Sequence, residues 1–360
     1  MAILRLLHAW SGAFLSLILI VLGLSGALLV FKNDWVNATM SAASGPTRTD
    51  AAHLGKITQR IETAFQAQGL KSVVFAGDGV GLHKVALKDD TSAWVSEDGA
   101  NIALFEPNER LEDWLFDLHH HLLAGDTGET IAGLAGLAGA LLTITGLVLT
   151  WPSLLMFAFR VSPLSGKRAH LLAAHRDLGT MLAPLVLLSL VTGSMIIFSD
   201  QTRPLFQVVA PGPKVPKPPV VGSGKINWPF AVANAQNRFP NATVRLVIWP
   251  AEKGKPATVR LRQAGEWHTN GRTIVWIDPA TSKAVGVVDA QMLGKGDRAW
   301  NSLWPLHASK LGTGFGARIV DIMTALTGLG LAALGAYGLV AFVRGRLFGV
   351  RKKRTALQIS

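Results

Sequence analysis

Cysteine is absent from the 360 residues of the chain, and charged residues make up only 16% of it. Without cysteine the chain cannot form disulfides, attach a c-type haem covalently, hold an iron–sulfur cluster through thiolates or use a cysteine nucleophile. The shortage of charge, together with 49% hydrophobic residues and a mean hydropathy of +0.33, excludes an ordinary soluble enzyme. The composition predicts a membrane protein with modules outside the membrane.

Four apolar runs are each long enough to cross a bilayer, which needs about 20 residues. They cover residues 11–31, 131–151, 178–198 and about 319–343. The first run has features of a signal peptide, but its apolar core is longer than the usual span of about 7–15 residues. Because the same run recurs later in the chain, we interpret it as a retained transmembrane helix. An even number of spans places both termini on one side.

The charges around the runs predict the orientation. One side holds a single acid, Asp177, and eleven basic residues: Arg5, Arg160, Lys167, Arg168, Arg176, Arg344, Arg346, Arg351, Lys352, Lys353 and Arg354. The other side holds nearly equal numbers of acidic and basic residues. By the positive-inside rule both termini lie in the cytoplasm and the soluble segments lie outside. The basic tail at 351–354 is interpreted as a topology anchor, and nucleic acid is not expected as a partner.

The stretch 7–31 occurs a second time as 174–198. Counted from the histidine near its start, the shared positions are His8 and His175, Gly12 and Gly179 at +4, Gly26 and Gly193 at +18, and Phe31 and Phe198 at +23. In a helix +18 is five turns, about 27 Å, so each histidine and its second glycine share a face at opposite sides of the membrane. His119, Leu123, Gly128 and Ile131 likewise match His307, Leu311, Gly316 and Ile319. These matches predict an internal duplication.

The expected fold is an α-helical membrane protein with four transmembrane helices and two small α+β periplasmic domains. The expected order is helix 1 at 1–37, a first outside domain at 38–113, a histidine-bearing segment with helix 2 at 114–151, a loop at 152–176, helix 3 at 177–199, a second outside domain at 200–298, a histidine-bearing segment with helix 4 at 299–345 and a basic tail at 346–360. In the outside domains we expect helices at 51–68 and 229–238, strands near 84–90, 91–97, 101–107, 243–250, 257–263, 272–279 and 283–289, and a hairpin turn at 278–282.

Histidines gather at both predicted membrane edges. His8 and His175 lie at the cytoplasmic edge, and His119, His120, His121 and His307 lie at the outer edge. A single histidine at such an edge is usually an interfacial side chain, but a pair on facing helices supplies the two axial ligands of a six-coordinate iron. Zinc usually takes three or four protein ligands, so two histidines at an edge favour haem. Gly12, Gly179, Gly26 and Gly193 would leave room for the porphyrin, or would simply allow close packing, as Gly133, Gly136 and Gly139 would.

Four motifs carry a family resemblance: LHAWSG, LHHHLLAGDTGETIAGLAG, AHRDLG and PLHASKLGTGFGARI. The chain resembles the PepSY-associated transmembrane family, which includes inner-membrane ferric-siderophore reductases, and the outside segments resemble PepSY modules. The resemblance implies two b-type haems in a bacterial inner membrane, with His8, His175, His119 and His307 as axial ligands. The triplet His119–His121 departs from the family pattern, so His120 and His121 stay alternatives to His119.

The resemblance implies electron transfer from the cytoplasmic side to periplasmic ferric iron, in a siderophore or another chelate. No GxGxxG fingerprint stands on a strand–turn–helix unit and the inner loop cannot hold a flavin domain, so a quinol or a separate reductase must donate the electrons. The alternative is a non-enzymatic PepSY membrane protein that binds a periplasmic peptide or protease, or transports a transition metal.

One spacing leaves two arrangements open. His119 and His307 precede their apolar runs by about twelve residues, which in continuous helix would place them roughly 18 Å outside the bilayer. Either the helices start deeper than hydropathy indicates, or the glycine-bearing stretches 122–128 and 309–316 fold back toward the membrane.

Overall fold

The computed structural model describes residues 1–312 and 314–357, without the side chains of 101, 102 and 347–357. The basic side chains expected at 351–354 therefore lie outside the described residues. The chain forms two compact units. The helical unit comprises Met1–Val30, Leu115–Ser199 and Arg318–Ser360, and the sheet unit comprises Phe31–Trp114 and Asp200–Ala317.

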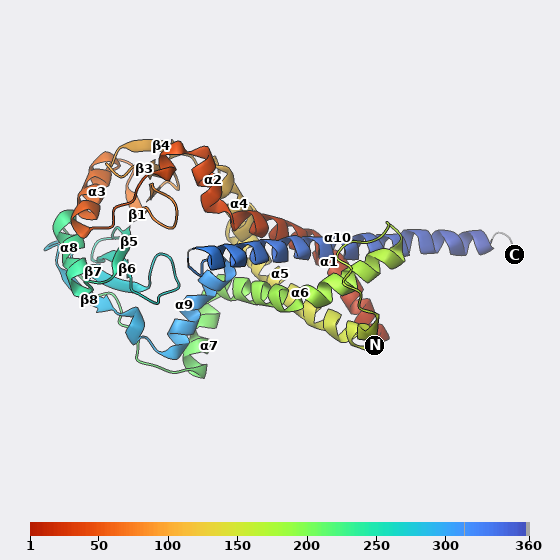
Figure 1. Cartoon of the computed structure of the whole chain (residues 1–360). Helices are drawn as coiled ribbons and strands as arrows, with labels where there is room; N and C mark the ends of the chain where they lie inside the picture. Colours follow the sequence, from red (N-terminus) through yellow and green to blue (C-terminus); the bar gives the residue numbers. More distant parts are fainter. Residues whose placement is uncertain (313, 358–360) are drawn as a thin grey trace. The chain divides into compact units, whose positions relative to one another are not determined.

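Four long helices form the helical unit and lie side by side in Figure 1: α1 (Ala2–Leu29), α5 (Gly125–Thr150), α6 (Arg168–Ile197) and α10 (Phe315–Leu357). Each contains a span that is long and apolar enough to cross a membrane, which confirms the four predicted spans. The short helix η2 (Trp151–Met156) follows α5. We call the end of this unit where α1 and α6 begin its basic end, because Arg5, Lys167, Arg168 and Arg344 lie there.

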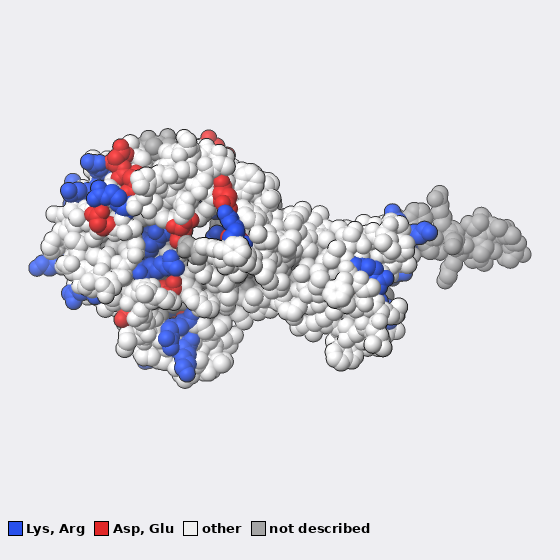
Figure 2. Space-filling model, in the orientation of Figure 1, with Lys and Arg blue, Asp and Glu red and all other residues white. Residues whose placement is uncertain are grey.

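Charge is distributed unevenly over the helical unit. On the face drawn in Figure 2, its middle is uncharged, and the coloured residues at the basic end are Lys and Arg. Uncharged side chains are required over the length that faces lipid, and basic residues at one end agree with the charge bias from which the sequence predicted the orientation.

Small residues bring the long helices close together. A Cβ on Gly23 of α1 would lie 2.5 Å from the carbonyl oxygen of Gly328 in α10. Between α5 and α6, a Cβ on Gly133 would lie 2.7 Å from the Phe198 ring, and the Ser194 hydroxyl donates to the Gly133 carbonyl over 3.0 Å. Gly133 therefore serves helix packing, which is the alternative that the sequence left open for it.

The sheet unit is built on one antiparallel sheet of eight strands in the order β4-β3-β2-β1-β5-β6-β7-β8. The strands are β1 (Leu70–Val74), β2 (His83–Leu87), β3 (Ser92–Val95), β4 (Asn101–Phe105), β5 (Thr243–Ile248), β6 (Ala257–Arg262), β7 (Thr273–Ile277) and β8 (Ala284–Val288). Helices α3 (Ala51–Ala64) and α8 (Trp228–Arg238) cover one face of the sheet and enclose the main core, whose largest fully buried side chain is Trp228.

Alternation of apolar and polar residues predicted seven of these strands, and helical patterns predicted both core helices. The sequence also predicted two separate sheets, and this is not what the structure has, because β1 pairs with β5 and joins both segments in one sheet. Strand β1 was not predicted, since LKSVV lacks a clear alternation of apolar and polar residues. The predicted turn is confirmed: the Ser282 amide donates to the Asp278 carbonyl over 2.7 Å.

Shorter helices complete the two units: α2 (Lys32–Thr39), η1 (Ser41–Ser44), α4 (Leu111–His121), α7 (Ser199–Val209), η3 (Ala290–Met292) and α9 (Lys295–His307). Between α4 and α5 the chain reverses at Leu122, Leu123 and Gly125, which all have positive φ. Gly128 then passes so close to the His121 carbonyl that any side chain would clash. α5 thus starts six residues before its apolar run, and the stretch before it folds back. The depth of His119 in the bilayer stays a prediction.

Candidate functional site

Two histidines predicted to act as a pair face each other at the basic end of the helical unit. The rings of His8 on α1 and His175 on α6 have their centroids 6.3 Å apart and an angle of 80° between their planes. Two imidazoles on a single metal ion, each with a nitrogen about 2 Å from it, have centroids roughly 6 Å apart. The separation therefore suits two axial ligands of one iron.

Hydrogen bonds set the tautomer of both rings. His175 Nδ1 lies 2.9 Å from the Leu334 carbonyl oxygen, which can only accept, so this nitrogen carries the proton. His8 Nδ1 lies 2.9 Å from the Thr145 hydroxyl, which already donates its proton to the Leu142 carbonyl over 3.0 Å. The hydroxyl must therefore accept from His8. In both rings Nε2 is left without a proton, which is the form that binds a metal.

Glycines on the neighbouring helices make room for these rings. A Cβ on Gly146 of α5 would lie 3.3 Å from His8 Cε1, and a Cβ on Gly338 of α10 would lie 3.3 Å from His175 Cε1. The sequence pointed instead to Gly12 and Gly179, whose added Cβ atoms would meet leucine side chains at 4.0 and 3.4 Å. The glycines that touch the histidines thus lie on α5 and α10. The sequence repeat relates α1 to α6, so it could not identify them.

A buried carboxylate fixes the loop next to His175. Asp177 is 1% exposed and accepts from Arg160 Nε and Arg176 Nε, each over 2.8 Å. It also accepts from the backbone N–H of Ala158 over 3.1 Å. The lone acid on the basic side is therefore fully paired, and it ties the loop after α5 to the first turns of α6.

His119 has the same arrangement near the other end of α1. Its Nδ1 lies 3.0 Å from the Ser25 hydroxyl, which donates its own proton to the Val21 carbonyl over 2.7 Å. Ser25 must therefore accept from His119, and Nε2 again lacks a proton. Gly26 makes room for the ring, because a Cβ there would lie 2.9 Å from His119 Cε1. Gly26 was predicted to leave room beside a haem, and in the structure it contacts the histidine itself.

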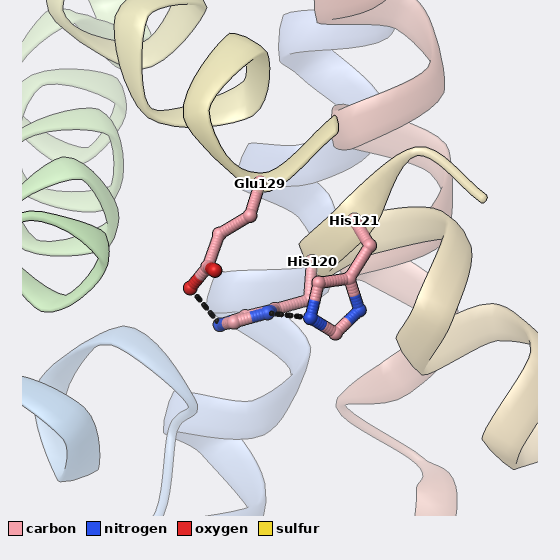
Figure 3. Close-up of side chains that lie close together, drawn as sticks. All are labelled: His120, His121 and Glu129. Atoms are coloured by element: carbon pink, nitrogen blue, oxygen red, sulfur yellow. Dashed lines mark hydrogen bonds and ion pairs between the residues drawn. The ribbon is translucent and has the colours of Figure 1, made fainter. Parts of the chain in front are cut away.

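The two other histidines of the triplet point to a different environment, drawn in Figure 3. His120 Nδ1 lies 3.1 Å from His121 Nε2, and His120 Nε2 lies 3.7 Å from a carboxylate oxygen of Glu129. The Phe116 ring stacks on His120 with centroids 5.3 Å apart. Burial lowers the pKa of His120, and the neighbouring His121 lowers it further. Of the three, His119 has the surroundings that match those of His8 and His175.

The remaining predicted site residues are less closely defined. His307 ends α9 and belongs to the sheet unit, whereas His119 belongs to the helical unit, so their pairing stays a prediction. Gly193 lies half-buried in α6, five turns beyond His175.

Two buried histidines of the sheet unit, His83 and His268, accept a hydrogen bond at Nδ1 instead of donating one. His83 Nδ1 accepts from the Ala76 amide over 3.0 Å, and His268 Nδ1 accepts from the Asn270 amide over 3.1 Å. Their protons therefore sit on Nε2. Burial lowers the pKa of His83 to about 4, helped by His53, and burial with three nearby arginines lowers the pKa of His268 to about 3. These are neutral structural side chains.

Comparison with known families agrees with the four motifs. The family described as PepSY-associated TM region matches residues 5–344, nearly the whole chain. The chain belongs to this PepSY-associated family. A search of curated proteins gives no match to it. Membership places the four long helices in a membrane and assigns no activity to the histidines.

Proposed function

We propose that this PepSY-associated protein is an inner-membrane b-type haem protein that passes electrons from the cytoplasmic side to ferric iron in the periplasm, as a ferric-siderophore reductase. The observation that carries the proposal is the His8–His175 pair, two rings 6.3 Å apart whose Nδ1 hydrogen bonds leave Nε2 unprotonated. Neutral imidazole in this form is the usual axial ligand of a b-type haem.

His8 and His175 would hold one haem at the basic end. His119, with its Nδ1 bonded to Ser25, would hold the second, and the repeat in the sequence assigns His307 as the other ligand. When bound, each haem supplies a centre that accepts and gives up one electron. Leu334 and Thr145 fix the rings of the first pair, and Gly146 and Gly338 keep the space beside them open.

The membrane arrangement follows from the charges. Lys and Arg at the basic end support a cytoplasmic location for the termini and the His8–His175 pair, with the sheet unit in the periplasm. The cytoplasmic or quinol donor would then deliver electrons near the loop that Asp177 holds. The matching order of one helix and four strands in 51–105 and 228–288 supports an internal duplication.

The ferric chelate would be the substrate, and the product is the ferrous ion. Hard oxygen donors bind Fe(III) more tightly than Fe(II), so the transfer of one electron releases the metal from its chelate.

A spectrum of the purified protein tests the proposal. After expression with adequate haem, we expect a Soret band and, on reduction, a sharp α band. An excess of ferric chelate should then reoxidise the haem and restore the spectrum of the oxidised protein. A ferrous-specific dye should report the released iron at the same rate. Protein without haem bands, or with haem that ferric chelates do not reoxidise, would contradict the function.

A further inference from the structure

Three metal-binding side chains meet at the turn between α4 and α5. One ligand atom each from His120, His121 and Glu129 lie within 4.8 Å of one another, in the cluster drawn in Figure 3. Two ligand atoms that each lie about 2 Å from one ion are at most about 4 Å apart, so small rotations of these side chains would bring all three atoms onto a single ion. The His120 and Glu129 side chains are 29% and 31% exposed, so an ion in solution can reach them.

A second carboxylate orients the cluster. His121 Nδ1 lies 2.8 Å from Asp117 Oδ1, so an ionised Asp117 accepts the proton of this nitrogen and His121 Nε2 becomes an acceptor. Without a metal, His120 Nδ1, 3.1 Å away, donates to it, and a metal ion bound to His121 Nε2 would replace this hydrogen bond. His120 Nε2 faces the Glu129 carboxylate, 3.7 Å away. A metal ion bound there would replace the proton by which a protonated His120 pairs with Glu129.

We propose that His120, His121 and Glu129 bind a divalent first-row transition-metal ion. Two imidazoles and one carboxylate form a known ligand set for Zn²⁺ and for Fe²⁺, and they leave further positions open to water or another ligand. Asp117 holds His121 as the outer carboxylates of metal sites usually hold a ligating histidine. The sharp reversal at Leu122 and Leu123 brings Glu129 back beside the two histidines.

This site is distinct from the proposed haem sites. His119 is bonded to Ser25 on α1, and the rings of His120 and His121 are bonded to each other and to Asp117 and Glu129. The metal site therefore remains if the chain binds no haem.

Metal uptake by the purified full-length protein tests the inference. The protein, isolated through a tag without histidine, is dialysed against Zn²⁺ with a competing chelator, and in a second arm against Fe²⁺ under anaerobic conditions. We expect one ion per chain beyond any haem iron. His121→Ala and Glu129→Gln should each weaken binding by at least tenfold, and Asp117→Asn by about 10–100-fold, with the haem spectrum unchanged.

The pair His53 and Glu97 supplies the matched control. His53 Nε2 and a carboxylate oxygen of Glu97 are 2.9 Å apart in the sheet unit, and His83 Nε2 lies 3.9 Å from the other oxygen of Glu97. Because His83 Nδ1 accepts from the Ala76 amide, its Nε2 carries the proton and cannot bind a metal. Glu97→Gln should leave metal uptake unchanged. Equal uptake by wild type and Glu129→Gln, or loss of haem in His120→Ala or His121→Ala, would overturn the proposal. Uptake of only one of the two ions, Zn²⁺ or Fe²⁺, would support the proposal and identify the metal.

Discussion

The helical unit and the sheet unit surround histidine in opposite ways. In the helical unit Nδ1 donates its proton to an oxygen in three histidines, His8, His119 and His175. The other ring nitrogen, Nε2, therefore carries a lone pair. In the sheet unit Nδ1 of His83 and His268 accepts from a backbone amide, so an N–H points away instead. The bond at one ring nitrogen thus decides whether the other can bind a metal.

Loss of a ligand histidine should have the largest effect. His8→Ala removes an axial ligand of the basic-end pair, so we expect about half of the haem to be lost and reduction of ferric chelate to stop, because electrons cannot enter. Haem per chain and ferrous-dye kinetics measure both effects. His170→Ala, at the same end of α6 and bonded to Ser165, is the control. Equal haem in the two variants would contradict the ligand assignment.

Substitution of a glycine beside a ring should have the next largest effect. Gly26→Ala places a Cβ 2.9 Å from His119 Cε1, so the ring must move and the bond to Ser25 must stretch. We expect partial loss of one haem, measured as a smaller α band. Gly12→Ala, with its Cβ 4.0 Å from Leu142, should leave the band unchanged. If the two variants behave alike, the glycines act only through helix packing.

Removal of the hydrogen bond that sets the tautomer should have a smaller effect. Thr145→Val deletes the acceptor for His8 Nδ1, and loss of such a partner typically weakens metal binding about 10–100-fold. Haem transfer to a competing haem-binding protein measures this change. Thr143→Val is the matched control, because its hydroxyl donates to the Gly139 carbonyl within the same helix. Equally fast haem loss from both variants would show that the bond is unimportant.

The last prediction concerns the pH dependence of the stability of the sheet unit and not haem binding. His83 and His268 have pKa values of about 4 and about 3 in the fold, against 6.5 when unfolded. The unfolded state therefore binds protons first, and stability falls as pH drops below 6.5, by up to about 1.4 kcal/mol per pH unit for each histidine. Amide hydrogen exchange in the sheet unit should detect the loss. His268→Gln should flatten the profile, and an unchanged slope would contradict the assignment.

The sequence predicted the elements of the fold better than their pairing. Hydropathy located four spans and alternation located seven strands, since both patterns are local. The pairing of β1 with β5 was missed because it joins residues far apart in the chain, and LKSVV carries no strong pattern. The start of α5 could not be located from hydropathy, because Asp126 and Glu129 in its first turns lower the local hydropathy.

The candidate site shows the same limit. The repeat identified His8 and His175, which the structure brings together. It did not identify Thr145, Gly146, Leu334 or Gly338, because contacts between helices depend on their rotation about one another, which hydropathy does not encode. Nor did it predict the different surroundings of His119 and His120, since adjacent helical residues point about 100° apart and only packing decides which meets α1.

Electron paramagnetic resonance of the oxidised protein tests the central claim most directly. Two neutral imidazoles on one iron give a low-spin ferric signal, and rings held near the observed 80° should give the strongly anisotropic form of that signal. We predict low-spin haem alone in the wild type and the appearance of a high-spin signal in His175→Ala, because one axial ligand is lost. A high-spin signal in the wild type, or a low-spin spectrum unchanged by His175→Ala, would contradict the account.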